Sequence, residues 1–190
     1  MSKSDSGPED GYHHANLTGP QKPNYIPMKL IEFNISIQAS KQKVWSTMLH
    51  PDTYREWVED SWPGSFYKGK WEKDEKIRFI TEDGSGTLVL VKELQPYNYI
   101  LCEHIAILNA GGIEDITSKL ARDWVGMTER YSYTENGGVT NLKVQISTHP
   151  NWEDMFISGW PRALKKLKQI SEGSNNGFEM RLIKSFKDKR

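Results

Sequence analysis

The chain has 190 residues, and its 25 basic side chains balance its 25 acidic ones, so the formal net charge is zero. This balance argues against a nucleic-acid-binding protein, which usually carries a basic excess or stripe. No apolar run approaches the roughly 18 residues of a membrane helix, and the single cysteine, Cys102, excludes an intrachain disulfide. We therefore expect a cytoplasmic protein that does not insert into membranes.

The two ends of the chain differ from its middle. Residues 1–27 are rich in Ser, Gly, Pro, Asp and Lys and have no apolar periodicity, which is typical of a flexible segment. Apolar patterning starts at residue 28 and ends near residue 172, and all seven Trp lie between these points. We predict one domain over residues 28–172, followed by a C-terminal tail over residues 173–190.

The first predicted elements are a strand and two short helices. Apolar and polar residues alternate from Ile31 to Ile37, which is the period of a strand with one buried face. Ser40 then stands at the N-cap position of a helix over residues 41–50. Pro51 ends that helix or starts a second short one.

Turn signals divide the middle of the chain into strands. The Glu-Asn-Gly-Gly sequence at residues 135–138 is a hairpin signal. Residues 109–123 are expected to form a loop with a helical turn over residues 114–121. Short connections without intervening helices favour an antiparallel meander over a parallel sheet. The predicted strands span residues 65–70, 75–81, 87–94, 97–108, 124–134 and 139–148.

The last predicted element is a long amphipathic helix. Asn151 can cap its start, and Gly173 stops it. Pro161 lies inside the pattern, so we expect a kink there or a helix that starts near Ser158 or Gly159. The apolar stripe consists of Trp152, Phe156, Gly159, Trp160, Ala163, Leu164, Leu167 and Ile170.

These elements predict an α+β fold. A curved antiparallel sheet of about six to seven strands wraps around the long C-terminal helix, and two short helices follow the first strand. We expect an apolar cavity between the sheet and that helix.

Three segments of the chain match a known pattern. The first spans residues 39–57 and includes Val44-Trp45 and His50-Pro51-Asp52; the others are residues 91–96 and residues 159–167. In this order they resemble the START-like, or SRPBCC, helix-grip superfamily, which includes the birch pollen allergen. Within it, the chain is similar to the homologues of the activator of heat-shock-protein ATPase, many of which are uncharacterised. The likeness covers about residues 28–172.

The resemblance directs attention to the strand over residues 97–108. It implies that Ile100, Cys102, His104 and Ala106 face the cavity, although the opposite face is just as apolar and the residues alone leave both faces open. An inward His104 could donate a hydrogen bond to a ligand or act as a general base; otherwise it is a core histidine satisfied by a neighbour. Glu129 on the next strand is the candidate inward carboxylate, with an outward, solvated side chain as the alternative.

Aromatic residues are dense around the Pro63-Gly64 turn and along the final helix. They could line a cavity mouth or close one end of the core, and we expect Trp62 to be the exposed, functional one. On the helix, cavity lining and packing cannot be separated by sequence. The predicted cavity-lining, ligand-binding residues are Trp57, Trp62, Phe79, Ile100, Cys102, His104, Glu129, Tyr131, Trp152, Phe156 and Trp160.

Three functions follow from this pattern. We expect first a module that binds a small hydrophobic or amphipathic molecule, such as a lipid or an aromatic compound. The resemblance also implies a co-chaperone-like domain with a protein partner, and His104 with Glu129 could support an acid–base enzyme. The sequence contains no phosphate-binding loop, zinc-protease motif or nucleophile elbow, and its His and Cys residues lack metal-ligand spacing, so we expect no cofactor and no metal.

Overall fold

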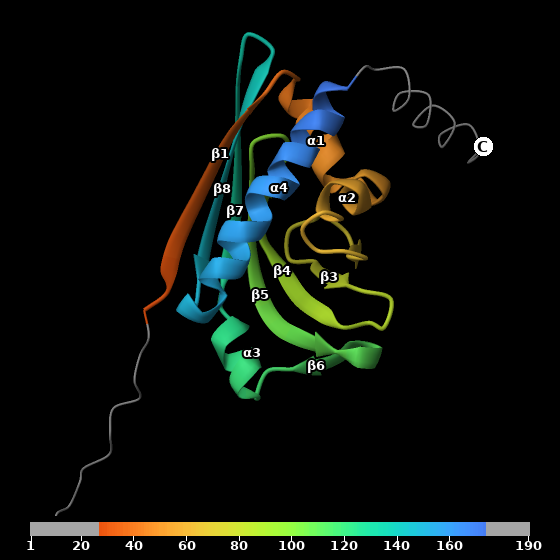
Figure 1. Cartoon of the computed structure of the whole chain (residues 1–190), viewed down its shortest axis with the longest axis vertical. Coiled ribbons are helices and arrows are strands. Elements are labelled where there is room, and N and C mark those ends of the chain that lie inside the picture. The colour runs from red at the N-terminus through yellow and green to blue at the C-terminus, as the bar shows by residue number, and fades with distance from the viewer. Residues whose placement is uncertain (1–26, 174–190) are drawn as a thin grey trace, which may run out of the picture.

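The computed structural model describes residues 27–173 (Figure 1). Apart from residues 27 and 173, the predicted N-terminal segment and C-terminal tail lie outside the described residues. The fold contains one antiparallel sheet with the strand order β1-β8-β7-β5-β4-β3-β2, and β6 pairs with β5. The strands are β1 (Lys29–Ile37), β2 (Phe66–Lys68), β3 (Lys76–Ile80), β4 (Gly86–Gln95), β5 (Tyr99–Asn109), β6 (Ile113–Asp115), β7 (Thr128–Asn136) and β8 (Val139–Thr148). The helices are α1 (Lys41–Leu49), α2 (Pro51–Val58), α3 (Lys119–Trp124) and α4 (Glu153–Glu172), with 3-10 turns at Ala110–Gly112 and Pro150–Trp152.

The sheet curves around α4, as Figure 1 shows, and α1 and α2 lie beside α4. The predicted α+β architecture, with two short helices after the first strand and a long C-terminal helix, is confirmed. The hairpin predicted at residues 135–138 joins β7 to β8: Asn136 pairs with Val139, and both intervening glycines have positive φ.

Local signals start the first two helices. The Ser40 side chain accepts a hydrogen bond from the Lys43 backbone N–H at 3.3 Å and so caps α1. His50 ends α1 and caps α2 at once, because its Nδ1 accepts from the Asp52 backbone N–H, also at 3.3 Å. Pro51 takes the first position of α2, where its missing N–H costs no helical hydrogen bond.

The long helix α4 is continuous through Pro161. A start near Ser158 or Gly159 is therefore excluded, and Asn151 does not cap the helix, because it lies in the 3-10 turn that precedes it. Gly159 is required by packing, since a Cβ atom there would lie 2.8 Å from Cζ2 of Trp62. The buried apolar stripe of α4 consists of Phe156, Gly159, Trp160, Ala163, Leu164 and Leu167.

The structure corrects the sequence prediction for residues 109–128. The expected loop contains a short strand, β6, which pairs with the end of β5 and gives the sheet eight strands rather than six or seven. A helix, α3, follows from Ser118, whose side chain accepts from the Ala121 backbone N–H at 3.0 Å. Trp124 thus ends a helix instead of starting a strand, and the strand begins only at Thr128 after a left-handed Gly126.

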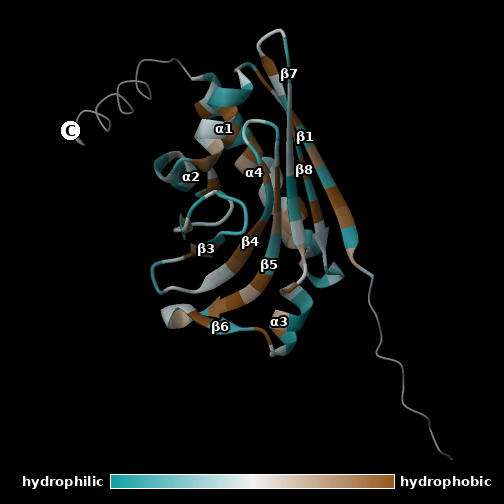
Figure 2. Cartoon of the chain, turned by 180° about the vertical axis from the view of Figure 1, so that it is seen from behind, coloured by the Kyte–Doolittle hydropathy of each residue, from teal (hydrophilic) through white to brown (hydrophobic). Residues whose placement is uncertain are grey.

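The core lies between the concave face of the sheet and the helices. It combines residues of every long strand with α1, α2 and α4, and Figure 2 shows extended hydrophobic stretches along β4 and β5. A smaller cluster contains Ile80, Leu88, Ala106 and Leu108. Among the helices of residues 27–173, none is both long and apolar enough to cross a membrane.

Candidate functional site

A cleft with a volume of about 690 Å³ opens between the sheet, α4, α2 and α3. Its wall is mainly apolar and rich in aromatic residues. Among the described residues that line it, Glu129 is the sole carboxylate, and there is no Lys or Arg. The aromatic lining residues are Tyr54, Trp57, Trp62, Trp71, Phe79, Trp124, Tyr131, Trp152, Phe156 and Trp160.

The structure separates the eleven predicted lining residues into two groups. Ile100 and Cys102 are buried in the core and are not part of the cleft wall. Burial, together with the nearby Glu129 carboxylate, raises the pKa of the Cys102 thiol well above its ordinary value. The residues that do line the cleft are Trp57, Trp62, Phe79, His104, Glu129, Tyr131, Trp152, Phe156 and Trp160.

An irregularity in the pairing of β5 with β4 changes which β5 side chains point inward after His104. His104 pairs with Val89 and Ala106 pairs with Leu88, so Ile105 has no partner and forms a β-bulge. His104 is 3 % exposed and lines the cleft, whereas Ala106 packs in the second cluster with Leu88. The bulge therefore separates two side chains that simple alternation would place together.

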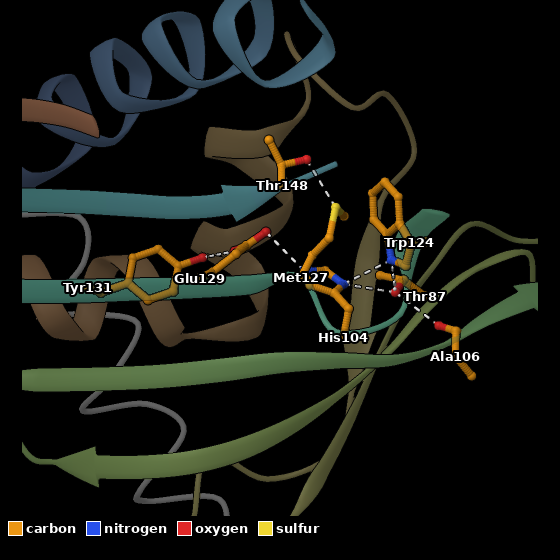
Figure 3. Close-up of polar contacts among 8 residues, drawn as sticks. All are labelled: Thr87, His104, Ala106, Trp124, Met127, Glu129, Tyr131 and Thr148. Atoms are coloured by element: carbon orange, nitrogen blue, oxygen red, sulfur yellow. Dashed lines mark hydrogen bonds and ion pairs between the residues drawn. The ribbon is translucent and has the colours of Figure 1, made fainter. Parts of the chain in front are cut away.

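The register between β5 and β7 brings the Glu129 carboxylate next to His104 in the cleft. Cys102 lies opposite Glu129, and Ile100 lies opposite Tyr131. Because cross-strand partners share a face, the buried Cys102 and Ile100 require Glu129 and Tyr131 to point inward as well. His104 Nε2 then lies 3.3 Å from Glu129 Oε1, and the Tyr131 hydroxyl donates to the other carboxylate oxygen (Figure 3).

The opposite side of the His104 ring meets a tryptophan and a threonine (Figure 3). Trp124 Nε1 donates to Thr87 Oγ1 at 2.8 Å and to His104 Nδ1 at 3.0 Å. The Glu129 carboxylate is an acceptor, so the His104 ring carries a proton on Nε2, and Thr87 Oγ1 lies 3.0 Å from Nδ1 as a further partner. The arrangement is a chain of donors from Trp124 through His104 to Glu129.

Burial keeps the neighbouring Tyr131 protonated. Desolvation, and then the Glu129 carboxylate, raise the pKa of Tyr131 well above its ordinary value. Tyr131 therefore remains a phenol and a hydrogen-bond donor. The Glu129 side chain is 17 % exposed and receives donors from both His104 and Tyr131.

Sequence reasoning missed two members of this cluster. Thr87 was expected only as the start of a strand, and Trp124 as part of another. Trp124 reaches His104 because α3 turns the chain toward the cleft before β7 begins. The Trp124 and His104 rings lie edge to face, with their centroids 5.1 Å apart. The Ser118 cap and the Gly126 turn are the local signals that could have indicated this helix.

Comparison with known proteins identifies the architecture. No protein-family model and no curated protein sequence matches the chain. Solved structures do match, including the solution structure of the Aha1 dimer from Colwellia psychrerythraea, with a TM-score of 0.59 at 18% identity over 78% of this chain and 99% of that one. The chain has the helix-grip fold.

Other helix-grip structures show the same likeness. Protein MLL2253 from Mesorhizobium loti has a TM-score of 0.59 at 14% identity, over 74% of this chain and 95% of that one. The crystal structure of CalU16 from Micromonospora echinospora has a TM-score of 0.52 at 15% identity, over 80% and 81% of the two chains. At these identities the similarity establishes the fold and no particular activity.

Proposed function

We propose that this protein binds a small hydrophobic or amphipathic molecule in the cleft between its sheet and α4. The observation that carries the proposal is the cleft itself: about 690 Å³ of space with a mainly apolar wall, rich in aromatic residues, and one buried polar cluster. Ligand sites of small molecules typically have volumes of roughly 300–1,000 Å³, apolar walls and a few well-placed polar groups.

The wall contains both parts that such a ligand needs. Trp57, Trp160 and Phe156 offer apolar surface from α2 and α4, and Phe79 adds to it from β3. The hydrogen-bonded cluster around Glu129 offers the polar contact that would orient the ligand. The nine predicted residues that line the cleft are accordingly the proposed contact residues.

The binding proposal is tested by native mass spectrometry of freshly purified protein. We expect an additional mass of a retained small molecule, and a rise in melting temperature when lipids or flat aromatic compounds are added, because a ligand that binds the folded state stabilises it. A single mass and unchanged melting across such a panel would refute binding.

Two matched variants localise the effect. Leu120 lines the cleft and is 49% exposed, whereas Leu30 is 67% exposed on β1 and lies outside the cleft wall. We expect Leu120→Trp to narrow the opening and reduce ligand uptake, and Leu30→Trp to leave it unchanged. Equal effects of both substitutions would place the ligand elsewhere.

A second candidate function is acid–base catalysis on the bound molecule. It is favoured by the His104–Glu129 pair, since both side chains line the cleft at a separation of 3.3 Å. The test is NMR detection of deuterium exchange at the protons next to the carbonyl of 2-acetylnaphthalene. We expect the wild-type protein to exchange these protons faster than buffer alone. His104→Asn and Glu129→Gln should each reduce the rate to that of buffer. Exchange at the buffer rate with the wild-type protein would count against catalysis of this class.

A further inference from the structure

The charge in the cleft wall is one-sided. Glu129 is its single carboxylate, and none of the described lining residues is a Lys or Arg that could neutralise it. The neighbouring acidic side chain on β5, Glu103, is paired with Lys92 at 3.3 Å and lies outside the wall. Resting on the proposed ligand-binding function, we propose that the cleft selects ligands with a cationic head, an organic ammonium group that pairs with Glu129.

The hydrogen bonds around Glu129 leave it able to receive such a group. His104 and Tyr131 each donate one hydrogen bond, to different carboxylate oxygens. A carboxylate has about four acceptor positions, so two remain. His104 meets the carboxylate through a single N–H, on Nε2, and Tyr131 through a single O–H, so neither donor occupies the remaining acceptor positions.

Aromatic pairs lie next to both residues that donate to the carboxylate, His104 and Tyr131. On the His104 side, the Trp124 ring packs against Phe156 with centroids 6.0 Å apart. On the other side, Tyr131 packs against Trp160 with centroids 5.9 Å apart. Ring faces attract organic cations, and aromatic cages are an established means of binding quaternary ammonium groups.

The same wall disfavours anionic ligands such as fatty acids. An anionic head would meet the Glu129 carboxylate without a basic side chain to receive it. The indole nitrogens of Trp71, Trp152 and Trp160 in the cleft wall are all sealed from solvent and so do not form an anion site. The cleft therefore discriminates by the sign of the head-group charge.

The experiment compares probes that share a tail and differ in the head. One set is decyltrimethylammonium, decanol and decanoate; the other is pyrenemethylamine, pyrenemethanol and pyrenecarboxylate. Each is titrated into the full chain by isothermal calorimetry. We expect the cation of at least one set to bind about tenfold or more tightly than its carboxylate, with the alcohol between them.

Variants assign that preference to one side chain. Glu129→Gln should remove most of the preference for the cation while preserving alcohol binding, and Glu129→Asp should retain it because the charge remains. Glu103→Gln removes the same charge from the opposite face of β5 and should leave the preference intact. Thermal unfolding of each variant confirms that it is folded.

The outcomes separate the inference from the proposal on which it rests. Carboxylates that bind as tightly as cations, or a cation preference unchanged in Glu129→Gln, would overturn the inference and leave ligand binding standing. If no probe of either set binds, ligand binding fails and the charge selection fails with it.

Discussion

His104 on β5 and Glu129 on β7 meet diagonally across the sheet, with 3.3 Å between Nε2 and Oε1. Glu129 pairs directly with Cys102, two residues before His104. Diagonal neighbours on one face of an antiparallel pair lie within reach of long side chains. The contact therefore depends on the β5–β7 register.

The Tyr131 hydroxyl should matter more to stability than that of a nearby tyrosine. Tyr131→Phe removes a donor from the Glu129 carboxylate, and a hydrogen bond to a charged group contributes about 1.5–3 kcal/mol. Tyr133→Phe is the matched control, because that hydroxyl contacts only the weak acceptor Sδ of Met48 at 2.7 Å. Urea unfolding should show the larger loss for Tyr131→Phe; equal losses would argue against a structural role for the Glu129 contact.

Trp124 and Glu129 together should determine the tautomer of His104. In the wild-type protein we expect ¹⁵N NMR to show the proton on Nε2, because Trp124 Nε1 donates to Nδ1. Trp124→Phe combined with Glu129→Gln removes both the donor to Nδ1 and the acceptor for Nε2–H, and should populate the other tautomer, in which Nδ1–H donates to Thr87 Oγ1 at the present 3.0 Å separation. An unchanged spectrum in the double variant would contradict the assignment. Trp45→Phe, on α1 outside the cleft wall, serves as the control.

The effect of substituting Gly159 on stability should depend on Trp62. A Cβ at position 159 would lie 2.8 Å from Trp62 Cζ2, so Gly159→Ala forces the indole away and should cost about 1–3 kcal/mol of stability. In a Trp62→Leu background the same substitution should instead stabilise by up to about 1 kcal/mol, because Ala favours the helix over Gly. A double-mutant cycle measured by urea unfolding checks the sign change. Additive effects would show that the two residues do not compete for space.

Cys102 should be inert in the folded protein. Burial and the Glu129 carboxylate raise the pKa of its thiol, so little of the reactive thiolate exists at pH 8. Maleimide should label the single cysteine far more slowly in the folded protein than in the unfolded one, and Glu129→Gln should speed labelling of the folded protein somewhat. Rapid labelling of the native wild-type protein would contradict the prediction.

The same raised pKa predicts a direction for stability against pH. The folded state retains the thiol proton more tightly than the unfolded state, so this contribution is constant below the ordinary thiol pKa. Stability then falls as the pH rises above it, because only the unfolded chain releases the proton. Cys102→Ala should remove that part of the alkaline slope in urea titrations, whereas an unchanged slope would show that other groups cause it.

Much of the architecture could be predicted from local patterns. The alternation from Ile31 to Ile37, the Ser40 cap and the glycines at 137 and 138 each specify a local conformation, and each is present in the structure. The segment around α3 could not be predicted as well, because its six residues carry too short an apolar pattern to distinguish a helix from a strand.

The sequence by itself determined the periods of the elements, and so the sheet, the long helix and the aromatic character of the space between them. Tertiary structure alone decided which side chains meet there. Both faces of β5 are apolar, so alternation could not choose between them, and a bulge at Ile105 then separated His104 from Ala106. The register that places Glu129 opposite Cys102, and the α3 turn that brings Trp124 to His104, arise from contacts between distant segments. Local sequence does not encode such pairings, because they are set by the packing of the whole sheet against α4.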